Sequence, residues 1–221
     1  MTLNIIELIN CAKNAYYDKN IISKKRTKCI EKGDIFVRLE YYSATSVIVS
    51  FRGTDSLYDW MYNLSRWSST FLQKDISVHT GFLNHMTDVY SEIQDGIRQL
   101  YGNDVHMIQN IYVTGHSLGG AVSVLFGAKT AQENPGLRIY VTTFGGPRVG
   151  NYAFKSWCIN THNLHIERYH NKWDMVTHLP YFGYYHVGKS IHVVTQTYRF
   201  RITKNHSMTT YTKSIVQNYT D

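Results

Sequence analysis

A serine set between two glycines, with one apolar segment before it and another after it, constrains the fold of this chain more than any other feature. Residues 107–114 (MIQNIYVT) carry apolar side chains typical of a strand, and an Ala/Val/Leu-rich run after Ser117 predicts a helix. Gly-x-Ser-x-Gly at a sharp strand-to-helix turn is a nucleophile elbow. Such a turn holds the serine hydroxyl clear of the sheet, at a helix N-terminus that favours negative charge.

The motif alone does not establish chemistry, because five-residue patterns of this kind also occur in ordinary loops. The predicted strand and helix on either side are the context that favours a nucleophilic Ser117. A serine hydroxyl also needs a histidine to take its proton and a carboxylate to orient that histidine. The rest of the chain must therefore supply a base and an acid.

The composition is that of a globular protein. The chain has 221 residues, of which 43% are hydrophobic and 18% are charged. We expect one domain over residues 1–221, with a sizeable core. No apolar run approaches the roughly 18 residues of a transmembrane helix. Polar residues interrupt the apolar positions of residues 1–20, so we expect no signal peptide.

The cysteines and the net charge limit the cellular compartment and the kinds of partner that we expect. Cys11, Cys29 and Cys158 cannot all pair within one chain, and their spacing fits no metal site. We therefore expect an intracellular, reducing location, without a metal or another cofactor. The net charge of +7 suits anionic surfaces. The basic residues are scattered apart from residues 23–28 (SKKRTK), which we predict to be a solvated loop, so we expect no nucleic-acid partner.

The predicted helices and strands alternate along the chain. They are a helix at 2–18, strands at 34–40 and 46–51, a helix at 81–101, the elbow strand and helix, a strand at 138–144, a short helix after Gly150, a strand at 164–169, a β-rich stretch at 190–202 and a closing helix. This alternation predicts an α/β protein with a mostly parallel central sheet flanked by helices. Catalytic groups then lie at the carboxyl ends of the strands.

Elimination identifies the acid, because only four acidic residues follow Ser117. Glu133 lies at the end of the elbow helix, Glu167 lies within a predicted strand, and Asp221 is the last residue. Asp174 follows the strand at 164–169, in the loop at its carboxyl end. In proteins with a nucleophile elbow, the acid and then the base follow the serine in the sequence. We therefore predict that Asp174 is the acid.

Four histidines follow Asp174, and their positions separate them. His178 lies one turn from the acid and shares its loop, His186 lies in an aromatic stretch, and His192 lies inside a strand. His206 comes after the last predicted strand, at the start of the closing helix. That position places it at the sheet edge where the acid lies, so we predict that His206 is the base.

Two groups are predicted to stabilise the oxyanion. The backbone N–H of Leu118, directly after the serine, is one donor. The other should come from a loop after an early strand, and residues 46–51 lead into Arg52-Gly53-Thr54. Thr54 offers both its N–H and its hydroxyl there.

Together these motifs resemble the class 3 lipases, the fungal triacylglycerol lipase-like family. The motifs occur in the order seen in that family: VIVSFRGTDSLYDWMYNL, VHTGF, YVTGHSLGGAVSVLFG, TFGGPRVGN, DMVTHLP and NHSMTTY. The resemblance implies the α/β-hydrolase fold and hydrolysis of lipid carboxylic esters. It also implies Ser117 as nucleophile, Asp174 as acid, His206 as base and Thr54 as the side-chain oxyanion donor. The chain is short for the family and lacks the disulfides of its secreted members.

Residues 56–64 (SLYDWMYNL) follow the oxyanion loop, where members of this family carry a lid. One apolar face with helical spacing is formed by Leu57, Trp60, Met61 and Leu64. We predict a lid that also contacts the acyl chain. The alternative is a helix that simply packs on the core.

The sequence therefore favours a serine hydrolase that cleaves triacylglycerol- or diacylglycerol-type esters at a lipid interface, through an acyl-enzyme. A peripheral contact with a membrane or lipid surface fits this interpretation. The alternatives are a phospholipase or a short-chain carboxylesterase with the same triad. A catalytically silent lipid-binding relative is a further alternative, although such a protein has no use for a complete triad.

Overall fold

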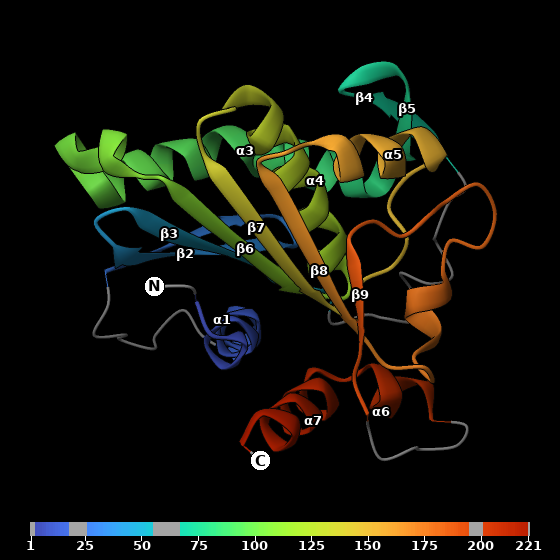
Figure 1. Ribbon diagram of the computed structural model, residues 1–221. Helices are drawn as coiled ribbons and strands as arrows, with labels where there is room; N and C mark the ends of the chain where they lie inside the picture. The colour runs from blue at the N-terminus through green and yellow to red at the C-terminus, as the bar shows by residue number, and fades with distance from the viewer. Residues whose placement is uncertain (1–2, 18–25, 55–66, 195–200, 221) are drawn as a thin grey trace.

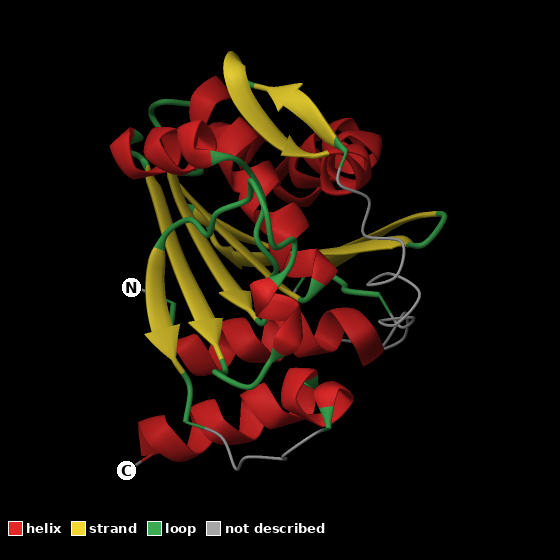
Figure 2. Cartoon of the chain, turned by 90° about the vertical axis from the view of Figure 1, so that its right-hand side faces the viewer, coloured by secondary structure: helices red, strands yellow, loops and turns green. Residues whose placement is uncertain are grey.

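A seven-stranded sheet with helices on both faces forms the body of the protein (Figures 1 and 2). The computed structural model describes residues 3–17, 26–54, 67–194 and 201–220. The strand order is β1-β2-β3-β6-β7-β8-β9. Strands β1 to β3 pair antiparallel, and β3 to β9 pair parallel.

The sheet strands are β1 (Thr27–Lys32), β2 (Ile35–Ser43), β3 (Ser46–Phe51), β6 (Asn110–His116), β7 (Arg138–Phe144), β8 (Leu164–His170) and β9 (Lys189–His192). A separate hairpin consists of β4 (Ser68–Phe71) and β5 (Gln73–His79). The helices are α1 (Ile5–Tyr17), α3 (Thr80–Tyr101), α4 (Leu118–Glu133), α5 (Tyr152–Asn160), α6 (Ile202–His206) and α7 (Met208–Thr220). Two 3₁₀ turns are η1 (Gly102–Met107) and η2 (Met175–His178).

Successive side chains along the central strands point to opposite faces of the sheet, and buried residues pack on both faces. On one face, Val113 of β6 packs in the large cluster that includes α3 and α4. On the other face, Tyr112 packs with residues of α1, and Phe144 of β7 packs with α1 and α7. The sheet is therefore covered on both sides, with α3, α4 and α5 above it and α1 and α7 below it in Figure 1.

These observations confirm the predicted α/β class, with a mostly parallel central sheet flanked by helices. Strands 46–51 and 138–144 have the predicted bounds. The elbow strand begins later than predicted, at Asn110. The reason is Gly102, whose φ of 57° ends α3 and turns the chain into the 3₁₀ segment η1, which takes up Met107.

The basic segment 23–28 is not wholly the loop that the sequence predicted. Thr27 and Lys28 begin β1, because buried Ile30 anchors this edge strand and every residue of it pairs with β2. Residues 23–25 lie outside the described residues. The hairpin β4–β5 was not predicted.

The C-terminal prediction needs a second correction. The predicted β-rich stretch 190–202 contributes β9, but Ile202 begins the helix α6. His206 is the last residue of α6 rather than the first part of the closing helix. Ser207 separates the two helices, because its side-chain oxygen accepts from Thr210 N and caps α7. Residues 195–200 lie outside the described residues.

No helix in the part of the chain that the structure describes combines the length and the apolar character needed to cross a membrane.

A tight backbone approach between α4 and the end of β3 sets the first prediction. A Cβ on Gly119 would overlap the Phe51 carbonyl oxygen and lie 2.8 Å from the Arg52 carbonyl oxygen. Gly119→Ala should therefore destabilise the protein by about 2 kcal/mol or more, because backbone atoms cannot give way as flexible side chains do. That loss lowers Tm by roughly 4–8 °C for a chain of this size.

Gly136→Ala is the matched control, because nothing lies within 4 Å of a Cβ at that position. Calorimetry of both variants beside the parent chain measures the difference. Equal Tm values for Gly119→Ala and the parent would contradict the packing described here.

Candidate active site

Ser117 occupies a sharp turn between β6 and α4. Its φ of 59° and ψ of −128° lie in a region that L-residues rarely adopt. The Ser117 N–H donates to the Phe144 carbonyl oxygen at 3.0 Å, which ties the turn to the end of β7. A Cβ on Gly115 would overlap Gly119 and lie 2.8 Å from Ser123 Oγ. The glycines of the motif are therefore required by close backbone contacts, and the strain is held in place by the surrounding chain.

The Ser117 hydroxyl is buried but has no hydrogen-bond partner within the described ranges. It lies at the first turn of α4, where the leading N–H groups of a helix have no intrahelical acceptor. The helix dipole adds partial positive charge at this end. This environment favours negative charge on an oxygen held beside Leu118.

His206 and Asp174 form a buried pair next to the elbow. His206 Nδ1 lies 2.8 Å from Asp174 Oδ2 and 2.9 Å from Oδ1. Because Nδ1 must carry the proton to donate to a carboxylate, a neutral ring presents its lone pair at Nε2. His206 Nε2 has no hydrogen-bond partner among residues 3–17, 26–54, 67–194 and 201–220. The structure thus brings the predicted base and acid together.

The Ser117 hydroxyl and His206 Nε2 are not hydrogen-bonded to each other in this geometry, because each atom is without a partner in the described part of the chain. His206 nevertheless lies beside the elbow, since its ring centroid is 4.6 Å from that of His116. Hydrogen bonds between a nucleophile and its base are often long in free enzymes and tighten when substrate binds.

The carboxylate of Asp174 accepts hydrogen bonds from two groups besides His206. Oδ1 accepts from Val176 N at 3.0 Å, and Oδ2 accepts from the Tyr211 hydroxyl at 2.7 Å. Burial, together with the neighbouring Asp174 carboxylate, raises the pKa of Tyr211 well above its usual value, so the phenol stays protonated and donates. The same hydroxyl accepts from Asn171 N at 3.0 Å.

His116, the residue before the serine, connects the site to α1. Its Nε2 donates to the His206 carbonyl oxygen at 2.6 Å, and its Nδ1 accepts from the Tyr16 hydroxyl at 2.8 Å. Burial, and secondly the proximity of His206, lowers the pKa of His116 well below 6.5. His116 is therefore neutral, with its proton on Nε2, and it fixes the backbone of the predicted base.

Thr54, the predicted side-chain oxyanion donor, lies in the segment after β3 that passes close to the elbow. A Cβ on the preceding Gly53 would lie 2.7 Å from the His116 carbonyl oxygen and would overlap the Tyr16 hydroxyl. Only a glycine at position 53 lets the chain before Thr54 pass this close to His116, the residue before Ser117. The four predicted lid residues, Leu57, Trp60, Met61 and Leu64, lie outside the described residues, so the lid stays a prediction.

The histidines that the sequence argument set aside have other contacts. His178 ends η2, His192 ends β9, and His186 Nε2 donates to the Thr177 carbonyl oxygen at 2.6 Å. No group of three or more His, Cys, Asp or Glu side chains is arranged to hold a metal ion in the described part of the chain.

Sequence reasoning missed four residues of this site: Tyr16, His116, Asn171 and Tyr211. His116 could have been found from the sequence, because it directly precedes Ser117 in the recognised motif. The other three come from α1, the loop after β8 and α7, and no local pattern joins such distant segments.

Comparison with known proteins gives consistent matches. The sequence profile of the family described as Lipase (class 3) matches residues 48–184. A lipase of Rhizomucor miehei is 31% identical over 153 residues, which cover 66% of this chain and 41% of that protein. A chloroplastic phospholipase A(1) of Arabidopsis thaliana is 30% identical over 155 residues, covering 61% of this chain and 33% of that protein. The chain spans about two fifths of the length of the curated fungal lipases it matches.

Solved structures agree with these matches. A lipase from Rhizopus microsporus var. chinensis superimposes with a TM-score of 0.70 and 26% identity, covering 87% of this chain and 75% of that one. The Rhizomucor miehei triacylglyceride lipase gives a TM-score of 0.72 at 24% identity, covering 85% and 78%. These likenesses confirm the predicted α/β-hydrolase fold.

Three histidines around the site predict how stability depends on pH. Burial lowers the pKa of His186 to about 3 and that of His170 to about 4. It also lowers the pKa of His116 well below 6.5. In the unfolded chain the histidine pKa is about 6.5. Below that pH the unfolded state binds protons that the native state does not, so their stabilisation is present above pH 6.5 and is lost as pH falls. His116 and His186 each contribute up to about 1.4 kcal/mol per pH unit, and the less buried His170 contributes less because solvent screens it.

Urea unfolding at pH 7, 6 and 5 measures this loss, in a window above the titration of most carboxylates. His186→Gln keeps a hydrogen-bond donor for Thr177 but does not titrate, so the slope should fall by about one such contribution. A free energy of unfolding that stays constant from pH 7 to 5, or an equal slope in the variant, would contradict the lowered pKa of these histidines.

Proposed function

The chain belongs to the class 3 lipase family, and from that membership and the geometry of the site we propose that it hydrolyses carboxylic esters of lipids through a covalent acyl-enzyme. One observation carries the proposal. Next to one strand-to-helix turn with a strained backbone at Ser117, the buried Ser117 hydroxyl and the buried His206 Nε2 have no hydrogen-bond partner among the described residues, and the Asp174 carboxylate bonds to the other nitrogen of His206. Buried polar atoms without partners cost about 1–3 kcal/mol each, so their presence favours a functional role.

In the first half of the proposed reaction, Ser117 Oγ attacks the ester carbonyl carbon while His206 Nε2 accepts the hydroxyl proton. Asp174 stabilises the imidazolium through Nδ1–H. The carbonyl oxygen becomes an oxyanion that accepts from the N–H of Leu118 and from Thr54. Collapse breaks the bond to the alcohol, which leaves with the proton from His206.

In the second half, His206 takes a proton from water, which attacks the acyl carbon. The acid product then leaves, and the proton returns to Ser117 Oγ. Each step uses groups of this chain and water, so the proposed reaction needs no metal or cofactor.

We infer that the preferred esters are acylglycerols met at a lipid surface. Proteins named lipase in Rhizomucor and Rhizopus, and one named secreted mono- and diacylglycerol lipase in Fusarium solani, support this substrate class. Phospholipids are the second candidate, favoured by the similarity to proteins named phospholipase A1 in Arabidopsis and rice. Peripheral contact with a membrane belongs to the same proposal.

Ser117→Ala should lower the rate of ester hydrolysis at least about 10³-fold, because it removes the nucleophile. Asp174→Asn should lower it about 10⁴-fold, because the base loses its charged partner. Ser214→Ala, which truncates a buried serine on α7, is the matched control and should keep the parent rate.

The measurement uses nitrophenyl esters of increasing chain length beside triglyceride and phospholipid emulsions, so the same series ranks the substrates. A fully active Ser117→Ala protein that still melts cooperatively would remove Ser117 from the reaction.

Tyr211→Phe tests how the acid is held. The variant loses the hydroxyl that donates to Asp174 Oδ2 and accepts from Asn171 N. A hydrogen bond to a charged group contributes about 1.5–3 kcal/mol, so kcat should fall about 10- to 100-fold with KM little changed. Tyr101→Phe is the matched control, because it also removes a buried phenol. The Tyr101 hydroxyl donates to the carbonyl oxygen of Ser43 at the end of β2, so this variant should lower stability but not kcat. Equal kcat values in the two variants would show that Tyr211 does not position Asp174.

A further inference from the structure

The loop between η2 and β9 displays aromatic side chains to solvent. Phe182 is 78% exposed and Tyr181 is 63% exposed, with their rings 5.8 Å apart. Tyr185 of the same loop and Tyr152 at the start of α5 are also exposed, and their rings meet edge to face at 5.7 Å. Contiguous exposed apolar surface of this kind marks a binding surface more often than chance.

Hydrogen bonds hold this loop in place, so the exposure is built into the fold. Arg148 N donates to the Leu179 carbonyl oxygen at 2.7 Å, and Arg148 Nη1 donates to that of Tyr181 at 2.9 Å. Tyr185 N donates to the Gly150 carbonyl oxygen at 2.7 Å. The aromatic rings are therefore presented outward by an ordered backbone.

The charge beside these rings is positive. Arg148, Lys155 and residues 181–186 line a groove of about 420 Å³, and this set includes no carboxylate. The Arg148 guanidinium lies 5.6 Å from the centre of the Tyr181 ring. Among the described residues that line the groove, His186 is the remaining side chain that could carry a positive charge, and its pKa of about 3 leaves it neutral at pH 7. The groove therefore complements an anion.

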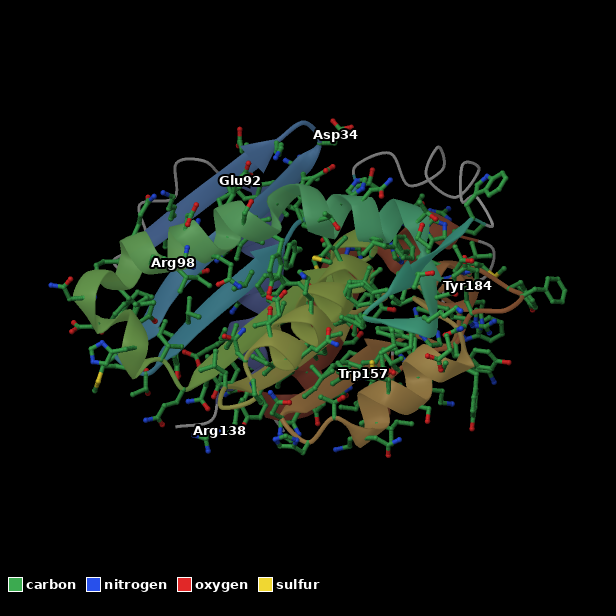
Figure 3. The ribbon with its side chains drawn as sticks, turned by 90° about the horizontal axis from the view of Figure 1, so that it is seen from above. Asp34, Glu92, Arg98, Arg138, Trp157 and Tyr184 are labelled. Atoms are coloured by element: carbon green, nitrogen blue, oxygen red, sulfur yellow. The ribbon has the colours of Figure 1, made fainter. Side chains whose placement is uncertain are left out.

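The aromatic loop lies on the same side of the molecule as the site. It begins directly after η2, which Asp174 caps, and His186 Nε2 bonds back to Thr177 of that turn. Figure 1 shows this loop, in orange, to the right of β8 and β9. Tyr184 donates its hydroxyl to the carbonyl oxygen of Trp67, whose side chain is 76% exposed. In Figure 3, Tyr184 lies at the end of the molecule opposite Arg98.

We propose that this surface docks on an anionic lipid surface and so brings lipid close to the Ser117 site. The docking surface consists of Trp67, Tyr152, Tyr181, Phe182 and Tyr185 with Arg148 and Lys155. Tyrosine and tryptophan favour the membrane interface, because one end of each ring system is apolar and the other is polar. Basic side chains near an anionic leaflet add attraction that falls off within a Debye length. The docking role rests on the proposed hydrolysis of lipid esters.

Binding is measured by co-sedimentation of the Ser117→Ala protein with vesicles of ether-linked lipids, which the enzyme cannot cleave. One set is phosphatidylcholine alone, and the other contains about one third phosphatidylglycerol to give an anionic surface. The double variant Tyr181→Ser with Phe182→Ser should partition at least about tenfold more weakly on the anionic vesicles. Met107→Ser, which removes an exposed apolar side chain from η1 next to the end of α3, should leave binding unchanged.

The charge is tested separately with Lys155→Gln. This variant should bind anionic vesicles about fivefold more weakly and neutral vesicles as the parent does. Arg138→Gln removes an exposed positive charge far from Tyr184 in Figure 3 and serves as the matched control.

The same substitutions in the chain with Ser117 intact separate docking from chemistry. Hydrolysis of a dissolved short-chain ester should be unchanged, while hydrolysis of lipid in anionic vesicles falls in parallel with binding. A parent chain that binds vesicles but cleaves no ester would refute the proposed function and leave docking standing. Docking is overturned if the double variant and Met107→Ser bind equally well, or if the parent binds a protein through this surface and binds no vesicle.

Discussion

The backbone of Ser117 is the constraint on which the rest of the site depends. A φ of 59° at a residue with a side chain is costly, and it persists because the Phe144 carbonyl oxygen holds the Ser117 N–H while Gly115 and Gly119 let neighbouring chain approach. This turn sets the serine at the first turn of α4, against the carboxyl ends of β6 and β7. The end of β7 and the close approach of α4 to β3 hold it in place.

Around this turn, hydrogen bonds join segments that are far apart in the sequence. Tyr16 of α1 bonds to His116, and His116 bonds to the backbone of His206. Tyr211 of α7 bonds to Asp174 in the loop after β8. The N-terminal and C-terminal helices therefore do more than cover one face of the sheet, because each contributes a phenol that fixes one member of the predicted acid–base pair.

Much of the fold was predictable, since the elements near the site carry strong local patterns. Strands β3 and β7 are short and rich in β-branched and aromatic residues, and the elbow motif marks its own turn. The limits of β6 and α6 were missed because a glycine turn and a serine cap fix them. Elimination chose Asp174 and His206, which the structure brings within hydrogen-bond distance. Their supporting tyrosines were missed because only tertiary packing brings α1 and α7 to the sheet edge.

The most direct test of the central claim is a crystal structure of the chain after reaction with an alkyl phosphonate, a stable mimic of the tetrahedral intermediate. The account predicts phosphorus bonded to Ser117 Oγ, with the phosphonyl oxygen within about 3 Å of Leu118 N and of Thr54. It also predicts His206 Nε2 turned toward Ser117 Oγ, with Asp174 still on Nδ1. Phosphorus on another residue, or a phosphonyl oxygen pointing away from Leu118, would contradict the account.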